Sequence, residues 1–229
     1  MDPNRDLFRA IERNDLDGVR SALAEGANPN ARDESTRPRA TLPLSSGDTP
    51  LITAAKLGRA EIAEELIRAG ADVKARDREL GETALHWAVC AYLYPSIISE
   101  LYLRTAELLI KHGADVNDRE NEFGFSPLRL IFFPVFHADL YSFAELLIRN
   151  GADPDLRTLE GRKTPYHGGF PDWRSPRECN PRIINSILGK IEREKSISAD
   201  PPRASDITRE ARKRGPIAQT KPTATTAKI

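Results

Sequence analysis

Apolar residues recur along this chain at helical spacing, in short segments that end at glycine. One helix face within Gly47–Asp77 carries Leu51, Ala54 and Ala55. Thr49 is placed to cap this helix, and Pro50 follows at the first helical position, where a missing N–H costs nothing. The alanines have little side chain, so we expect another backbone to approach this face closely.

A second short helix follows in the same stretch. Its apolar face carries Ile62, Ala63, Leu66 and Ile67. Gly58 ends the first helix and Gly70 ends the second, since glycine readily adopts the left-handed conformation found at helix ends. Two helices joined in this way cannot bury both of their faces alone, so the pattern predicts neighbouring copies.

Copies of these signals are present along the chain. The helix-ending Gly-Ala-Asn/Asp motif begins at positions 26, 70, 113 and 151. The helix-starting pattern G-x-T-P-L occurs at 47–51, with variants at 81–85 and 124–128 and a weaker copy at 164–167. The second-helix sequence AEELIRAG at 63–70 returns in related form at 106–113 and 144–151. These copies predict a stack of similar hairpins.

The recurring motifs resemble those of the ankyrin repeat family, whose period is about 33 residues with a T-P-L-H-x-A signature. The resemblance covers roughly residues 4–168. It implies an all-α fold: an ankyrin-repeat solenoid of helix–turn–helix repeats with connecting hairpin loops. It also implies a structural role for His86 at the T-P-L-H position, where the histidine ties neighbouring turns by hydrogen bonds.

We expect an ankyrin domain over residues 1–194, with about four repeats, a partial fifth and a C-terminal capping helix at Arg182–Glu194. Residues 2–33 form a diverged first repeat with a polar outer face, as a terminal repeat requires. We expect residues 172–181 to be irregular. Residues 34–46 are an insertion, interpreted as an exposed mobile loop rather than an ordered binding finger. Residues 195–229 are poor in apolar residues and predicted to be a disordered basic tail.

Two further insertions separate the helices of the third and fourth repeats, at 91–103 and 133–140. Leu85 lies 28 residues before Gly113, against 19 from Leu51 to Gly70. Each insertion has a proline, Pro95 or Pro134, and we expect the residues beyond it to extend the second helix toward its N-terminus. The insertions bring aromatic residues together, either as a satellite core or as an exposed patch that receives a partner: Tyr92, Tyr94, Tyr102, Phe133, Phe136, Tyr141 and Phe143.

The composition and charge of the chain argue against several classes of function. The chain has 34 Lys+Arg and 34 Asp+Glu, and this balance argues against a nucleic-acid surface. No membrane span or signal peptide is evident, so we expect a cytoplasmic protein, or one delivered into another cell by a route without a visible signal. No catalytic, cofactor or metal constellation is found, and Cys90 is interpreted as a packing residue. We therefore predict a monomeric, non-enzymatic scaffold that binds another protein.

By resemblance, ankyrin arrays bind through the tips of the loops between repeats and the concave face of the first helices. The tips are Arg78–Glu82, Glu120–Phe125 and Thr158–Arg162, and the first-helix positions include Glu12 and Arg13. The predicted partner-binding residues are Leu57, Glu79, Leu80, Glu82, Phe123, Phe125 and Phe133. Exposed apolar side chains with a charged surround suit a protein surface. In the alternative, Leu80 and Phe123 fold back onto a neighbouring loop. A second hypothesis places the activity in the basic tail.

Overall fold

The computed structural model describes residues 2–34, 47–90, 99–119, 121, 124–132, 140–158 and 175–199. The chain divides into two compact units, Met1–Gly189 and Lys190–Ile229. Among the described residues the regular elements are helices, and the predicted all-α ankyrin solenoid is confirmed. The helices are α1 (Pro3–Arg13), α2 (Leu16–Ala24), α3 (Pro50–Lys56), α4 (Ala60–Arg68), α5 (Ala84–Val89), α6 (Ser99–Lys111), α7 (Pro127–Ile131), α8 (Leu140–Arg149), α9 (Pro176–Cys179) and α10 (Pro181–Ala199).

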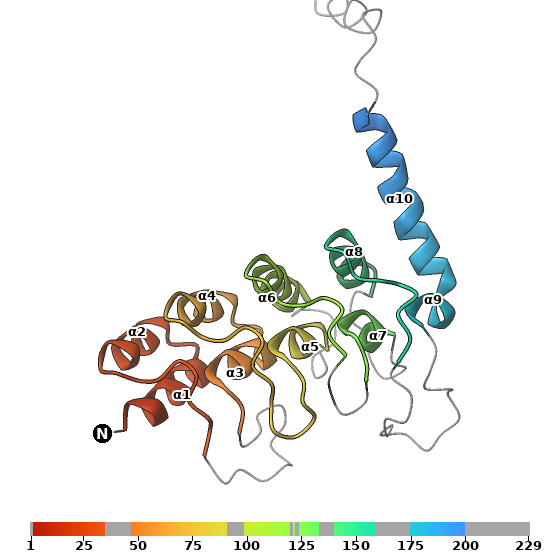
Figure 1. The fold of residues 1–229 in the computed structure, drawn as a ribbon. Coiled ribbons are helices and arrows are strands. Elements are labelled where there is room, and N and C mark those ends of the chain that lie inside the picture. The colour runs from red at the N-terminus through yellow and green to blue at the C-terminus, as the bar shows by residue number, and fades with distance from the viewer. Residues whose placement is uncertain are drawn as a thin grey trace, which may run out of the picture. The chain divides into compact units, whose positions relative to one another are not determined.

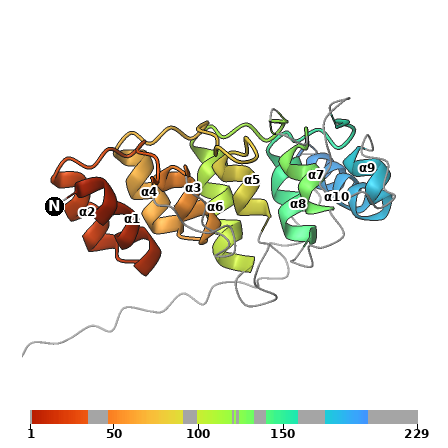
Figure 2. The same cartoon turned by 90° about the horizontal axis from the view of Figure 1, so that it is seen from below.

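The first unit stacks helical hairpins side by side. Helices α1, α3, α5 and α7 form one row, and α2, α4, α6 and α8 form a second row (Figure 1). Figure 2 shows the same order of hairpins from below. The loops that join one hairpin to the next project from the row of first helices (Figure 1). We call α1, α3, α5 and α7 the inner helices and the other row the outer helices.

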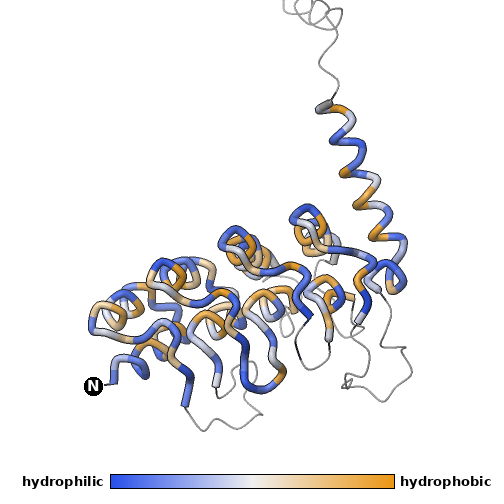
Figure 3. Tube along the Cα trace, viewed as in Figure 1, coloured by the Kyte–Doolittle hydropathy of each residue, from blue (hydrophilic) through white to orange (hydrophobic). Residues whose placement is uncertain are grey.

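The core lies between the two rows, and apolar segments recur along the helices (Figure 3). At most 1% of each of these repeated apolar side chains is exposed: Leu51, Ala54, Ala55, Ile62, Ala63, Leu66, Leu85, Ala106, Leu109, Leu128, Ala144 and Leu147. The apolar faces predicted for the second repeat are therefore confirmed except at Ile67, which is half-buried. Because each hairpin buries its faces against its neighbours, the core is continuous along the stack.

The helix starts follow the predicted capping chemistry. Thr49 Oγ1 accepts the N–H of Ile52 at 3.3 Å, with Pro50 at the first helical position. Ser126 does the same for α7, accepting the N–H of Arg129 at 3.2 Å. Gly70 ends α4 with φ +95°, a backbone conformation that is strained for any residue with a Cβ.

The predicted extension of the second helix is confirmed in the third repeat. Helix α6 has 13 residues, against 9 in α4 and 10 in α8. Most residues of both insertions lie outside the described part of the chain. Tyr102 and Phe143, from the predicted aromatic group, are 4% and 1% exposed. Both side chains therefore belong to the core.

The C-terminal end differs from the prediction in two respects. A helix is present where the capping helix was predicted, as α10, but it continues to Ala199, so residues 195–199, predicted to belong to the disordered tail, are helical. The stretch before it, predicted to be irregular, contains the short helix α9. Ser175 and Glu178 form a reciprocal capping box around Pro176, and this local motif is strong enough to start one helical turn.

Candidate protein-interaction surface

The loop between α4 and α5, residues 76–83, is built around the Asp77 carboxylate, and we call it the Asp77 finger. Asp77 Oδ1 accepts the backbone N–H groups of Glu79, Leu80 and Gly81 at 2.9, 2.6 and 3.0 Å. Its Oδ2 accepts the indole N–H of Trp87 at 2.7 Å. Asp77 is 6% exposed. One buried carboxylate thus fixes the backbone of the tip and ties it to α5.

The structure leaves three of the predicted partner-binding residues at least partly accessible. Glu79 and Leu80 are half-buried at the tip of the Asp77 finger, beside the exposed Arg78. Leu57 is half-buried at the C-terminal end of α3. Phe123 and Phe133 lie outside the described residues. The accessible part of the predicted surface is therefore the finger tip and, separately, Leu57 at the C-terminal end of α3.

The expectation that Phe125 is an exposed tip residue is wrong, because Phe125 is 1% exposed. It directly precedes Ser126, the N-cap of α7, and forms a buried cluster with Leu130 and Cys90. A residue in that position characteristically packs against the fourth helical residue, here Leu130. The residue directly before each Thr or Ser N-cap packs against the helix, and this position in the sequence would have predicted that Phe125 is buried.

Glu82 occupies the same position before Thr83 and is 3% exposed, so its assignment to the tip is also wrong. Asp48, before Thr49, is 1% exposed. Side chains at this position turn inward between neighbouring inner helices. The predicted packing role of Cys90 is consistent with its burial.

Charged side chains meet in a buried cluster beneath the Asp77 finger. Lys56 Nζ contacts Asp48 Oδ1 and Oδ2 at 3.0 and 2.8 Å and lies 4.0 Å from the centre of the Trp87 ring. Burial, together with the nearby Asp77 charge, raises the pKa of the Glu82 carboxyl to about 8, and the Lys56 charge opposes this shift. We call Asp48, Lys56, Asp77, Glu82 and Trp87 the buried polar cluster.

His86 performs the role that the family resemblance implied. Its Nδ1 lies 2.8 Å from Thr83 Oγ1, and its Nε2 lies 3.1 Å from Phe125 O and 3.2 Å from Asp118 O. Burial lowers the pKa of His86, against the opposing effects of Asp118 and the two carbonyls. The neutral ring therefore joins the third repeat to the loop that leads into the fourth.

Arginines at a regular spacing connect successive loops. Their contacts were not predicted from the sequence. Arg76 Nη2 contacts the Asp118 carboxylate at 2.8 and 3.0 Å, and Arg119 Nη1 donates to Arg157 O at 2.7 Å. The signal was available, because an arginine stands six residues after the glycine of each Gly-Ala-Asn/Asp motif. We call this set the arginine ladder: Arg32, Arg76, Arg119 and Arg157.

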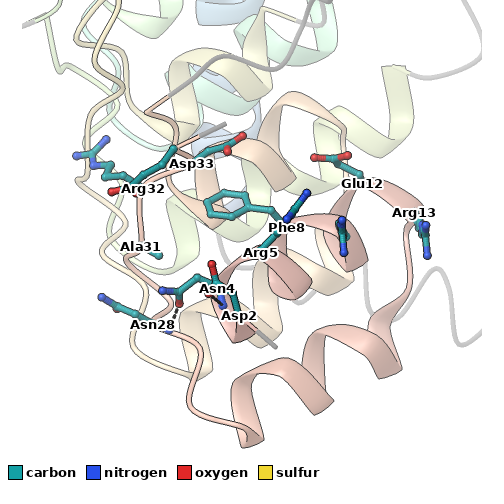
Figure 4. A pocket seen from close by; sticks show the side chains of 12 residues that line it. Asp2, Asn4, Arg5, Phe8, Glu12, Arg13, Asn28, Ala31, Arg32 and Asp33 are labelled. Atoms are coloured by element: carbon teal, nitrogen blue, oxygen red, sulfur yellow. Dashed lines mark hydrogen bonds between the residues drawn. The ribbon is translucent and has the colours of Figure 1, made fainter. Parts of the chain in front are cut away.

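The N-terminal end of the array has a hollow of about 930 Å³ between α1 and the loop after α2. Figure 4 shows side chains of both segments around it, including Arg5, Phe8, Glu12 and Arg13. Asn4 Oδ1 accepts the N–H of Asn28 at 2.8 Å across one side (Figure 4). Acidic and basic side chains are mixed in this lining, so its charge selects no class of ligand.

Comparison with known proteins assigns the family. Residues 7–120 match a family model described as ankyrin repeats, three copies. A Rickettsia bellii protein named as an ankyrin repeat protein is 32% identical over an alignment of 103 residues that covers 38% of this chain and 41% of that protein. With the repeated hairpins described above, the chain belongs to the ankyrin repeat family.

Shorter matches link the chain to much larger proteins. Neurogenic locus notch homolog protein 1 of Xenopus tropicalis is 56% identical over 45 residues, covering 20% of this chain and 2% of that protein. The Xenopus laevis protein gives the same values. The chain therefore spans less than half the length of each of these relatives. Ankyrin repeats generally mediate protein–protein interaction and are typically non-enzymatic. No described helix is both long and apolar enough to cross a membrane.

Proposed function

We propose that this ankyrin array is a non-enzymatic module that binds another protein through the tip of the Asp77 finger and the C-terminal end of α3. Leu80 and Leu57 are the apolar contacts of this surface, with Glu79 as a polar neighbour. Phe123 and Phe133 remain predicted contacts of the same surface. Glu82 and Phe125 do not belong to it, because they are buried.

One observation carries this proposal: the tip of the finger is held in a single backbone conformation before any partner binds. Three backbone N–H groups of the tip are bound by Asp77, which is itself bound to Trp87. A loop that is already ordered loses little conformational entropy on binding, so more of its contact energy appears as affinity. A half-buried leucine on an ordered tip is the kind of side chain that fills a partner's pocket.

The test is affinity capture from a source-cell lysate on three immobilised proteins, followed by affinity measurement with the captured protein. They are the wild type, the Leu57→Ala/Leu80→Ala double variant, and a Leu108→Ala control. Leu108 is half-buried on the outer helix α6, beside the groove between α4 and α6. Removing two interface leucines is expected to cost about 2–4 kcal/mol in total, a loss of about 30-fold or more. Equal affinity of the double variant and the wild type would overturn the proposal.

The basic tail is the rival location for binding. Residues 200–229 lie outside the described part of the chain, so the two hypotheses separate by deletion. A chain ended after Ala199 keeps the captured protein if the repeats bind it. Loss of binding in this truncated chain, with binding kept in the double leucine variant, would move the function to the tail.

A further inference from the structure

Two acidic residues stand at the base of the Asp77 finger, one on each side. The N–H of Asp77 donates to the backbone C=O of Glu82 at 2.9 Å, and Arg76 pairs with Thr83 in an isolated antiparallel bridge. Asp77 and Glu82 are 6% and 3% exposed. The base of the finger is thus closed by backbone contacts that bring two buried carboxyl groups near each other.

Of these two carboxyl groups, that of Asp77 is the one whose negative charge stabilises the closed finger. Its carboxylate accepts three N–H groups of the tip and the Trp87 indole N–H, and hydrogen bonds to a charged acceptor are the stronger kind. A second negative charge on Glu82 would repel Asp77 in surroundings where burial weakens solvent screening. The closed finger therefore favours a protonated Glu82.

The nearby cation offsets only part of this repulsion. Lys56, from α3, is ion-paired with Asp48 and lies against the Trp87 ring. Within the buried polar cluster, Asp48 and Asp77 already supply two negative charges to the one positive charge of Lys56. Ionised Glu82 would leave three negative charges against one.

We propose that the Asp77 finger is a pH-dependent element: protonated Glu82 keeps its base closed, and loss of the Glu82 proton to solvent opens the base and loosens the tip. An effect of this loosening on partner affinity rests on the proposed function, which places Glu79 and Leu80 of the tip in the binding surface. The loosening itself is a property of the unbound protein.

The other titratable groups packed around Glu82 stay in one form near neutral and mildly alkaline pH. Burial raises the pKa of Cys90, on α5, well above its ordinary value, and the Glu82 charge adds to this. Burial lowers the pKa of His86, also on α5, so its ring is neutral above about pH 6.5. The neighbouring Arg76 is paired with Asp118 at 2.8 Å. Glu82 is the described member of this group expected to titrate between about pH 6.5 and 9, with its pKa of about 8.

The experiment is an NMR pH titration of the full unbound chain from pH 6.5 to 9. It follows the amide resonances of Glu79, Leu80 and Gly81 and the indole N–H of Trp87. In the wild type these four signals are expected to shift together with a midpoint near pH 8, and their protection from exchange, relative to the intrinsic rate at each pH, should fall above it. Signals that stay constant across this range would overturn the proposal.

Two variants assign the transition to its residue. Glu82→Gln keeps the shape of the side chain without its proton equilibrium, so the four signals should not titrate. Glu79→Gln makes the same change of charge at the half-buried tip and should leave the midpoint near that of the wild type. A transition that persists unchanged in Glu82→Gln would overturn the assignment, even if the wild type titrates.

Partner affinity is measured separately across the same pH range. It is expected to fall above pH 8 for the wild type and not for Glu82→Gln. A finger that titrates while affinity stays constant in both proteins would contradict the location of the binding surface and leave the pH-dependent finger standing. If the four NMR signals stay constant with pH, the pH-dependent finger is contradicted, and the proposed binding surface is not.

Discussion

His86 connects two repeats through one buried ring, because its two nitrogens face opposite sides. Nδ1 is held by Thr83 at the start of α5, and Nε2 faces the carbonyls of Asp118 and Phe125 in the next loop. Asn121 Nδ2 adds a third contact at 3.0 Å. Removing the ring leaves buried polar groups without a partner, which costs more than the hydrogen bond itself contributes.

We predict that His86→Ala lowers the free energy of unfolding by about 2–4 kcal/mol. His112→Ala is the matched control, because His112 is exposed at the end of α6 and its loss should change stability by less than about 0.5 kcal/mol. Urea unfolding followed by circular dichroism measures both. Similar losses in the two variants would show that the ring contacts contribute little.

Gly47 and Gly113 form a second matched pair, since both have φ +88°. A Cβ on Gly113 would meet no atom within 4 Å, whereas on Gly47 it would lie 2.6 Å from Arg78 Cδ and 3.1 Å from Arg78 Cβ. Gly113→Ala should therefore cost only the backbone strain of about 1–2 kcal/mol. Gly47→Ala should cost measurably more in the same urea experiment, and equal costs would contradict the contact with Arg78.

At the scale of elements, the loops between repeats are joined to one another as well as to their own helices. Arg76 reaches from the Asp77 finger to Asp118 in the next loop, and Arg119 reaches on to Arg157. Arg157 in turn contacts Glu178 on α9 at 3.0 Å. These contacts connect the loops in a row. We therefore expect that breaking a contact in one loop lowers the local opening free energy of the neighbouring loop as well.

Arg76→Ala is expected to lower the local opening free energy of residues 77–83 by about 1 kcal/mol, a modest value because the Arg76 side chain is 36% exposed. Amide hydrogen exchange at those residues measures it. Arg68→Ala is the control, since its ion pairs with Glu64 and Glu65 lie on the exposed side of α4. Unchanged exchange in Arg76→Ala would mean that the loops open independently.

The helices and their caps followed from the sequence because both signals are local. Thr49-Pro50 and the spacing of Leu51 and Ala54 depend on neighbours within one turn. The burial of Glu82 and Phe125 depends on packing against the preceding repeat, where Lys56 lies near Glu82 and Cys90 contacts Phe125, and only the position before the helix cap hints at it in the sequence. The contacts of Asp77 were missed for a similar reason: one of its partners, Trp87, lies ten residues away on another element.

At the scale of the whole molecule, the stability of the first unit should depend on pH through Glu82 and His86. The raised pKa of Glu82 means that folded protein holds a proton that unfolded protein releases. Stability therefore falls as pH rises toward about 8. The lowered pKa of His86 has the opposite sign, and its contribution is lost as pH falls below about 6.5.

Between pH 6.5 and 8 we therefore predict that the free energy of unfolding falls by about 1 kcal/mol per pH unit. Glu82→Gln should abolish this slope and be more stable than the wild type at pH 8. Urea unfolding at several pH values measures both effects. A wild-type slope that is zero or positive would contradict the assignment of a raised pKa to Glu82.

The proposed binding surface of this ankyrin array is the tip of the Asp77 finger and the end of α3. A hydrogen-exchange footprint of the captured partner on the full chain tests it. We predict slower exchange on binding at residues 76–83 and around Leu57, with little change on the outer helices α2, α4 and α8. Protection confined to those outer helices, or to residues 200–229, would contradict it.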